Sequence, residues 1–190
     1  MKSSFTFAFA FLAFCAPSSA TAPAQNVTAT TPSPLTCGDP SDAVPWYFME
    51  IAGQNIYYST AITDVTVLVG DLAYTFLGIA ARVFTTQELS TVPFFHLQND
   101  QTSDNFFTTS TMERELALED GWGDAGITAY IYTSQICGSV PLYSLFQSID
   151  TIHFYTINAT TCDAMLAGTG GWADLGIAGY VLDLNPCAVD

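Results

Sequence analysis

The sequence repeats itself three times at a fixed interval, and this repetition limits the folds that the chain can adopt. A Val-Pro pair opens each copy, at Val44-Pro45, Val92-Pro93 and Val140-Pro141, so that one copy begins every 48 residues. Each copy continues with an aromatic segment, a second apolar segment and a segment centred on Gly-Ile. A period of this length indicates one supersecondary unit repeated in space, because a single unit cannot bury its own apolar face.

Each copy carries signals for two strands, a helix and a third strand. The expected first strands are VPWYFMEI, VPFFHLQN and VPLYSLFQ, and the second strands contain Asn55-Ile56-Tyr57, Asn105-Phe106-Phe107 and His153-Phe154-Tyr155. A capping box at residues 110–113 predicts a helix in copy two, and residues 160–168 predict its counterpart. In copy one the Val- and Thr-rich residues 60–69 predict a distorted or partly extended helix. Each third strand has a Gly-Ile pair, which begins at Gly78, Gly126 or Gly176.

Three such units predict a mainly β fold with short helices, of the α+β class. We expect three pseudo-symmetric strand–strand–helix–strand repeats that form a closed ring of small sheets, like a three-bladed propeller with the helices outside. The alternative is a β-trefoil, which also has three similar units, but whose units have four strands and no helix. Residues 44–190 should form a single domain, with copies one, two and three at 44–91, 92–139 and 140–190.

The faces of the first strands can be compared across the three copies. One face repeats aromatic and large apolar residues and is the expected core face: Tyr47, Phe95 and Tyr143, with Met49, Leu97 and Leu145. The other face varies, with Phe48, His96 and Ser144 at equivalent positions. The variation predicts exposure, and His96 is therefore predicted to be a solvated surface residue.

The N-terminal residues 1–22 have the features of a secretory signal peptide. Lys2 supplies a positive start, residues 5–16 form an apolar run too short to span a bilayer, and Ala20-Thr21-Ala22 is a small-residue cleavage site. Residues 23–43 are rich in Thr and Pro, which predicts a disordered spacer. We therefore expect a secreted, extracellular protein that does not insert into a membrane.

The charge of the chain is strongly negative. Only three Lys and Arg residues stand against 18 Asp and Glu, and the formal net charge is −15. Nucleic acid and anionic membrane surfaces would be repelled, so neither is an expected partner. The sequence contains no signal for an oligomeric state.

Four cysteines remain after Cys15 is removed with the signal peptide. An even number in an exported chain indicates two disulfides, and four cysteines allow three pairings. We expect Cys37–Cys187, which would tie the chain ends together, and the shorter closure Cys137–Cys162. The chain has no Cys-x-x-Cys pair, and its two histidines are far apart in sequence, so metal binding by the cysteines is not expected. No cofactor is expected, and a Ca²⁺ site built from clustered acids stays open although the chain has no EF-hand loop.

Two sequons predict N-glycosylation, Asn26-Val27-Thr28 in the spacer and Asn158-Ala159-Thr160 in copy three.

Several motifs together resemble a repeat family of unknown function in secreted fungal and bacterial proteins. That family reads Leu-Tyr-x-Leu-Tyr, Asp-His-Phe-Tyr-Thr, a Glu-Arg-rich helix, an aromatic residue and Glu-Gly-Ile-Ala-x-Tyr-Val. The matching segments here are 142–146, 153–156, Glu113-Arg114 and 176–181, and the resemblance runs from about Val44 to Leu182. It implies an accessory module of cell-wall-active proteins, and hence a binding role toward polysaccharide.

Copy one departs from that pattern at three positions. Asn55 stands where the family has His, Phe76 stands where the other copies have Asp, and Arg82 stands where they have Tyr. If each repeat carries a binding site, copy one is therefore expected to be degenerate, so that only the sites of copies two and three could work.

Copies two and three carry residue types that suit sugar recognition. Sugars are bound by aromatic faces that stack on C–H-rich surfaces and by carboxylates or amides that bond hydroxyl groups. The candidate ligand-binding residues are Trp122, Asp124 and Tyr130, Trp172, Asp174 and Tyr180, and in addition Asn105 and His153. We therefore predict a non-catalytic, lectin-like protein that recognises polysaccharide or cell-wall glycan. The competing interpretation is that the aromatics are core residues and that the carboxylates cap turns.

Two other functions stay open. The first is a secreted structural or protein–protein interaction role at a cell surface, which high aromatic content would also serve. The second, a glycoside hydrolase, is less favoured. The chain has no nucleophile elbow, zinc-protease motif or phosphate loop, and threefold repetition is more typical of binding. Two carboxylates alone could serve hydrolysis, but we assign no catalytic residue.

Overall fold

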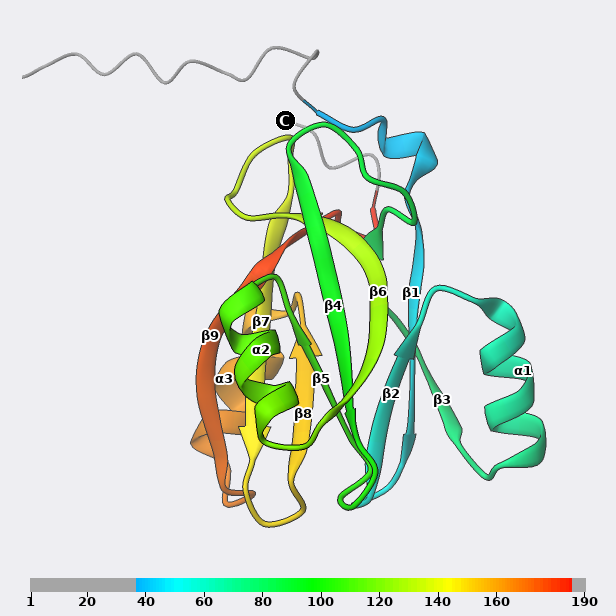
Figure 1. The fold of residues 1–190 in the computed structure, drawn as a ribbon, viewed down its shortest axis with the longest axis vertical. Coiled ribbons are helices and arrows are strands. Elements are labelled where there is room, and N and C mark those ends of the chain that lie inside the picture. The colour runs from blue at the N-terminus through cyan, green and yellow to red at the C-terminus, as the bar shows by residue number, and fades with distance from the viewer. Residues whose placement is uncertain (1–36, 186–190) are drawn as a thin grey trace, which may run out of the picture. The chain divides into compact units, whose positions relative to one another are not determined.

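The structure is a computed structural model that describes residues 37–185, within the compact unit Pro32–Asp190. The expected signal peptide and most of the expected spacer lie outside the described residues. The strands are β1 (Val44–Ile51), β2 (Asn55–Ser59), β3 (Thr75–Val83), β4 (Thr91–Asn99), β5 (Asp104–Thr108), β6 (Gly123–Tyr132), β7 (Val140–Gln147), β8 (Ile152–Thr156) and β9 (Trp172–Val181). The helices are α1 (Ile62–Asp71), α2 (Thr111–Glu119) and α3 (Ala159–Ala167), and a short 3₁₀ turn, η2 (Pro40–Asp42), precedes β1. Each copy therefore has the expected order of strand, strand, helix and strand (Figure 1).

The three strands of each copy form an antiparallel group with the first strand in the middle. β1 lies between β2 and β3, β4 between β5 and β6, and β7 between β8 and β9. The register between the first and third strands shifts twice in every copy, and in copy two it shifts between Phe94 and Phe95 and between His96 and Leu97. Gly126 pairs with His96 at this irregularity and has a φ of 91°. A side chain would be strained at such a φ, which accounts for the repeated glycine.

The expected closed ring of three separate sheets is wrong, and so is the β-trefoil alternative. Copy one forms a three-stranded sheet, β2-β1-β3, whereas copies two and three share a six-stranded half-barrel, β5-β4-β6-β9-β7-β8. The half-barrel is joined where Tyr132 of β6 pairs with Tyr180 of β9. The strand pairing between copy one and these strands is limited to isolated bridges, Arg82–Leu182 and Phe84–Tyr130. Similar sequences thus form unequal sheets, because the bonds between copies form at the ends of the third strands, where the copies differ.

The core is built from equivalent first-strand residues that meet between the sheets. Trp46, Phe94 and Leu142 are completely buried. The Trp46 ring stacks on Tyr58 at a centroid distance of 4.4 Å and meets Phe94 at 5.6 Å. Met49 and its equivalents Leu97 and Leu145 are also completely buried, as their position on the expected core face predicted.

The rest of the predicted face is wrong. His96 and Ser144 were expected at the surface but are 6% and 5% exposed, whereas Tyr47 and its equivalents are only partly buried. The two register shifts in each first strand interrupt the alternation on which the prediction depended.

The second strands contact one another through buried aromatic residues. The Tyr58 hydroxyl donates to the Tyr155 carbonyl at 3.1 Å and accepts from the Tyr155 amide at 2.8 Å. The Tyr155 hydroxyl likewise donates to the Phe107 carbonyl at 3.0 Å and accepts from the Phe107 amide at 2.8 Å. Burial raises the pKa of both hydroxyls. These side-chain bonds tie the three copies together in addition to the strand pairing.

Helix α1 is regular, although its sequence predicted a distorted or partly extended segment. It spans Ile62–Asp71, and the Ser59 hydroxyl before it accepts from the Ala61 amide at 3.0 Å. The β-branched residues lower helix propensity by only a few tenths of a kcal/mol each. Contacts of α1 with all three strands of copy one (Figure 1) are therefore enough to keep it helical.

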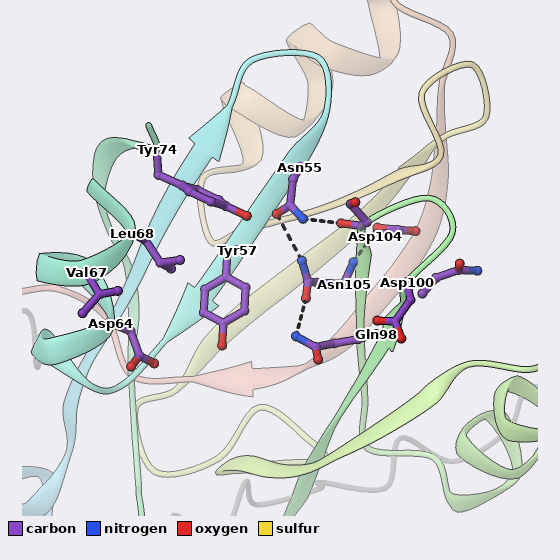
Figure 2. A pocket seen from close by; sticks show the side chains of 12 residues that line it. Asn55, Tyr57, Asp64, Val67, Leu68, Tyr74, Gln98, Asp100, Asp104 and Asn105 are labelled. Atoms are coloured by element: carbon purple, nitrogen blue, oxygen red, sulfur yellow. Dashed lines mark hydrogen bonds between the residues drawn. The ribbon is translucent and has the colours of Figure 1, made fainter. Parts of the chain in front are cut away.

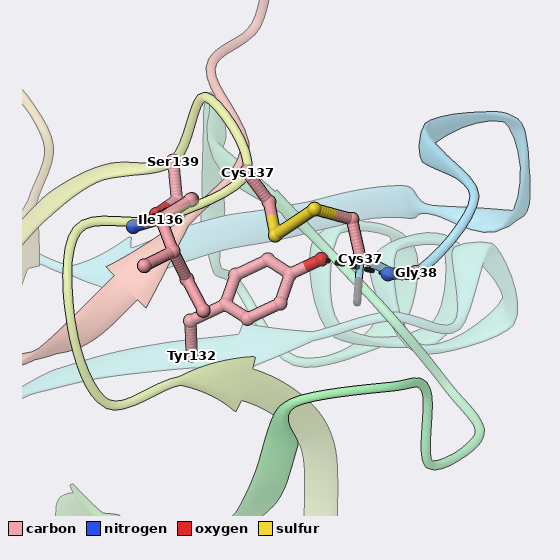
Figure 3. Close-up of a disulfide and its surroundings, with 6 residues drawn as sticks. All are labelled: Cys37, Gly38, Tyr132, Ile136, Cys137 and Ser139. Atoms are coloured by element: carbon pink, nitrogen blue, oxygen red, sulfur yellow. Dashed lines mark hydrogen bonds between the residues drawn. A yellow bond between two sulfur atoms is a disulfide. The ribbon is translucent and has the colours of Figure 1, made fainter. Parts of the chain in front are cut away.

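Both expected disulfides are wrong. Cys37 bonds to Cys137, with a Cα–Cα distance of 5.6 Å and a sequence separation of 100 (Figure 3). Next to this disulfide, the Gly38 amide donates to the Tyr132 hydroxyl at 3.1 Å. Cys162 is buried in α3 and has no disulfide partner among residues 37–185, and Cys187 lies outside them. The pairing depends on where residues 37–43 pass over the end of β6, which the spacing of cysteines does not reveal.

Candidate functional site

A cleft of about 410 Å³, here called the first cleft, lies between copies one and two. Copy one supplies Tyr57 from β2, side chains of α1 and Tyr74 from the segment before β3. Copy two supplies the end of β4, the turn after it and the start of β5. The principal lining residues are Tyr57, Asp64, Tyr74, Gln98, Asp100 and Asn105.

Asn105 forms the floor of the first cleft and joins the two copies. Its side-chain amide donates to Asn55 Oδ1 at 3.2 Å and to the Ile56 carbonyl at 3.1 Å. Its oxygen lies 2.9 Å from His96 Nε2 and 3.4 Å from Gln98 Nε2, which donates to it. Asn105 is 3% exposed, so its main effect is to position the groups around it.

The walls of the first cleft combine aromatic and polar groups. In Figure 2, side chains of α1 lie on one side of Tyr57, and Gln98 and Asn105 lie on the other. Burial raises the pKa of the hydroxyls of Tyr57 and Tyr74, so both stay protonated and can donate hydrogen bonds. Asp100 is an exposed carboxylate at the rim. The cleft therefore offers ring faces, amide groups and a carboxylate to one ligand.

His96 supports this cleft from below, and its burial predicts a pH effect. Its ring stacks on Phe107 at 4.4 Å, and burial lowers its pKa despite the bond to Asn105. An unfolded histidine takes up a proton near pH 6.5, whereas the folded one resists it, so stability falls as the pH drops below about 6.5.

We therefore expect the unfolding midpoint of the native protein to fall more between pH 7.5 and 5 than that of His96→Gln. Thermal unfolding of both proteins across this range measures the difference. All other titrating groups are shared, and parallel profiles would show that His96 is not the cause.

A second cleft, of about 560 Å³, lies between copies two and three. Copy two supplies β5, α2 and Trp122, and copy three supplies β7, the start of β8 and β9. The principal lining residues are Phe106, Glu113, Leu116, Asp120, Trp122, Ser144, His153, Leu175 and Ile177. Two of the predicted ligand-binding residues, Trp122 and His153, thus lie on opposite sides of the copy boundary in one cleft.

A buried pair joins the two clefts. His153 Nδ1 lies 2.7 Å from Asp104 Oδ2, and Asp104 Oδ1 accepts from the amides of His153 at 2.9 Å and of Asn105 at 2.8 Å. Asp104 lines the first cleft and is 3% exposed, whereas His153 lines the second. Each histidine of this region is therefore held by a side chain at the start of β5.

The two predicted carboxylates bond the backbone at the irregularities of the third strands. Asp124 Oδ1 accepts from the Gly126 amide at 3.0 Å, and Asp174 Oδ1 accepts from the Gly176 amide at 2.8 Å. Asp124 also pairs with Arg114, whose hydrogen bond is the main cause of its lowered pKa. Both carboxylates thus cap backbone amides, although within strands and not in turns, and Asp124 does not line the second cleft.

The other predicted aromatics are packed apart from the clefts. Tyr130 and Tyr180 pack against a buried cluster of Ala43, Phe84, Tyr132 and Leu182 near the disulfide. Trp172 packs against the main core and meets Phe154 at 6.0 Å. The structure thus does not gather either predicted set of Trp, Asp and Tyr into one site.

The sequence interpretation missed the first cleft because copy one was expected to be degenerate. Tyr74 stands four residues before Gly78, as Trp122 and Trp172 stand before their glycines. The aromatic at this position was therefore visible in the sequence, but its partners Gln98 and Asp100 belong to the next copy.

Asn158, one of the two predicted glycosylation sites, is exposed at the start of α3. Its side-chain oxygen caps the helix by accepting from the Thr161 amide at 3.1 Å. Asn26 lies outside the described residues.

Within residues 37–185, no helix is both long and apolar enough to cross a membrane. Nor does this part of the chain contain three or more His, Cys, Asp or Glu side chains grouped as a metal site would require.

Comparison with known proteins gives one match. A family model described as a domain of unknown function, DUF5648, matches residues 48–182. No curated protein and no solved structure matches the chain.

Proposed function

The chain belongs to the DUF5648 family, and we propose that it is a secreted, non-catalytic, lectin-like protein that binds polysaccharide or cell-wall glycan in the first cleft. The observation that carries this proposal is that two tyrosine rings and several amide and carboxylate groups share one open cleft. A pyranose ring has a C–H-rich face and a rim of hydroxyl groups. Tyr57 and Tyr74 suit the face, and Gln98 and Asp100 suit the rim.

The structure of the cleft favours a ligand held by many modest contacts. Asn105 and Asn55 are occupied with each other and with backbone groups, so they keep the floor rigid. A preorganised floor lowers the ordering cost that binding would otherwise carry. The side chains nearer the rim then make the contacts with the ligand.

The charge of the protein agrees with this class of ligand. With a formal net charge of −15, the chain repels polyanions but has no such conflict with neutral polysaccharide. Asp64 and Asp100, the less buried carboxylates of the first cleft, also repel polyanions and can accept hydrogen bonds from sugar hydroxyl groups.

We expect the double variant Tyr74→Ala/Asp100→Ala to lose roughly tenfold or more in affinity, because it removes a stacking face and a hydroxyl acceptor. Retention of the purified protein on insoluble chitin, β-glucan, mannan and peptidoglycan, followed by a glycan array, measures the loss. Tyr74→Phe should bind nearly as well as the native protein, since it keeps the ring.

Asp150→Ala is the matched control for charge. Asp150 is exposed in the turn between β7 and β8, which corresponds to the turn that carries Asp100. The proposal fails if the native protein is retained on none of the four polymers, or if the double variant binds as tightly as Asp150→Ala. Binding to a protein partner that no sugar competes with would then favour the interaction role instead.

A further inference from the structure

The second cleft repeats the construction of the first, one copy further along the chain. Five lining positions correspond: Tyr57 to Phe106, Asp64 to Glu113, Val67 to Leu116, Leu68 to Ala117 and Tyr74 to Trp122. The two carboxylates even make the same contact, since the Ser59 hydroxyl donates to Asp64 and the Thr108 hydroxyl donates to Glu113. The second cleft therefore has the same arrangement of lining positions as the first and is equally a candidate binding site.

The two clefts also differ at one position on the first strands. Ser144 of β7 stands where His96 of β4 stands, and it lines the second cleft. The exposed side chains of Leu175 and Ile177 on β9 also line the second cleft. The second cleft therefore has a broad apolar floor beside its aromatic wall.

The two clefts also differ in polar chemistry. The amides of Gln98 and Asn105 have no amide counterparts in the second cleft, whose charged groups are the exposed carboxylates of Glu113 and Asp120. No Lys or Arg is among the described residues that line it. Arg114 of α2 is held by Asp124 and lies over the Phe95 ring at 5.1 Å, so it is engaged elsewhere.

Trp122 completes the second cleft. Its ring is partly exposed and is held in place by Phe106 at 6.0 Å and by His153 at 6.1 Å. An indole face attracts a cation as well as the C–H face of a sugar. Together with the two carboxylates, it is suited to a ring that carries a positive charge.

We propose that the second cleft is a second glycan site, which takes a sugar with a protonated amino group, such as the glucosamine units of a deacetylated polysaccharide. This inference rests on the proposed function for the class of ligand, because the correspondence with the first cleft favours a sugar over a basic peptide. In this site, Trp122 and Leu116 would contact the apolar face of the sugar, and Asp120 and Glu113 would bind its ammonium group. The protein would then hold neutral and amino sugars in separate clefts.

Tryptophan fluorescence separates the two clefts, because the first cleft is lined by tyrosines and the second contains Trp122. Trp46 is completely buried and Trp172 packs on the core, so Trp122 is the tryptophan that a ligand in the second cleft would touch. We expect a saturable change in emission on titration with glucosamine oligosaccharides. Fully N-acetylated oligosaccharides of the same length should bind roughly tenfold more weakly, and added salt should weaken the charged ligand only.

Asp120→Asn is the decisive variant, because it removes the charge and keeps the size. It should weaken glucosamine binding roughly threefold to tenfold. Asp71→Asn is the matched control, since Asp71 occupies the equivalent place at the end of α1 and does not line the first cleft. Trp122→Phe should abolish the emission change, and calorimetry on that variant would report the remaining affinity.

The inference is overturned by any of three results. These are no emission change with glucosamine oligosaccharides, equal affinity for the acetylated ones, or equal effects of Asp120→Asn and Asp71→Asn. A lysine-rich peptide that binds when the sugar does not would also overturn it. Tyr74→Ala/Asp100→Ala should leave this titration unchanged, so failure of the first-cleft proposal would be seen separately.

Discussion

Replacement of both Cys37 and Cys137 by serine is expected to lower the free energy of unfolding by about 4 kcal/mol. The disulfide closes a loop with a sequence separation of 100 residues, and closure of a loop of that length removes much of the entropy of the unfolded chain. It also holds Gly38 where its amide bonds to the Tyr132 hydroxyl, so that the chain before β1 stays fastened to the end of β6. Urea unfolding of the native and double-variant proteins measures the change.

The control for this prediction is Cys162→Ala. Cys162 is buried in α3 and is not part of this disulfide, so the substitution should cost much less than the loss of the disulfide. The native protein should also lose stability on addition of a reductant, whereas the double variant should not respond in the same way. An unfolding midpoint that reductant leaves unchanged would contradict the assignment of the pair.

Asp104→Ala should destabilise the protein by about 3–5 kcal/mol, because it breaks a buried hydrogen-bonded pair and leaves its partners without an acceptor. The carboxylate accepts from the amides of Asn105 and His153 and from His153 Nδ1. Water cannot replace it easily, since Asp104 is 3% exposed. Chemical unfolding monitored by circular dichroism measures the loss.

The same substitution should weaken both proposed binding activities, because Asp104 holds Asn105 at the floor of the first cleft and His153 at the wall of the second. Asp104→Asn keeps an acceptor oxygen and should lose less stability than Asp104→Ala. If Asp104→Ala costs less than about 1 kcal/mol, the pair does not tie the clefts as inferred. The binding assays are to be run well below the unfolding midpoint of each variant.

The alignment of copy one with the other two copies from sequence differs by one residue from the alignment in the structure. The sequence comparison treated Asn55 as equivalent to Asn105 and His153 in the other two copies. The strand bounds instead make Asn55 equivalent to Asp104 and Ile152, because each of the three is the first residue of its strand. A slip of one residue moves a side chain to the other face of a strand. The departure at Asn55, one of the three that made copy one look degenerate, therefore reflects this slip, and copy one lines a cleft in the structure.

The sequence by itself determined the order of elements in each copy and the burial of Met49, Leu97 and Leu145. These features depend on the periodicity and backbone preferences of residues close together in the chain. Only the tertiary structure decided which copies share a sheet, which cysteines pair and which side chains face one cleft. Those outcomes depend on contacts between residues about 50 or more positions apart, which lie in different copies or, for Cys37, before the first copy. A pattern that repeats within each copy carries no information about such contacts, because they form where the copies meet.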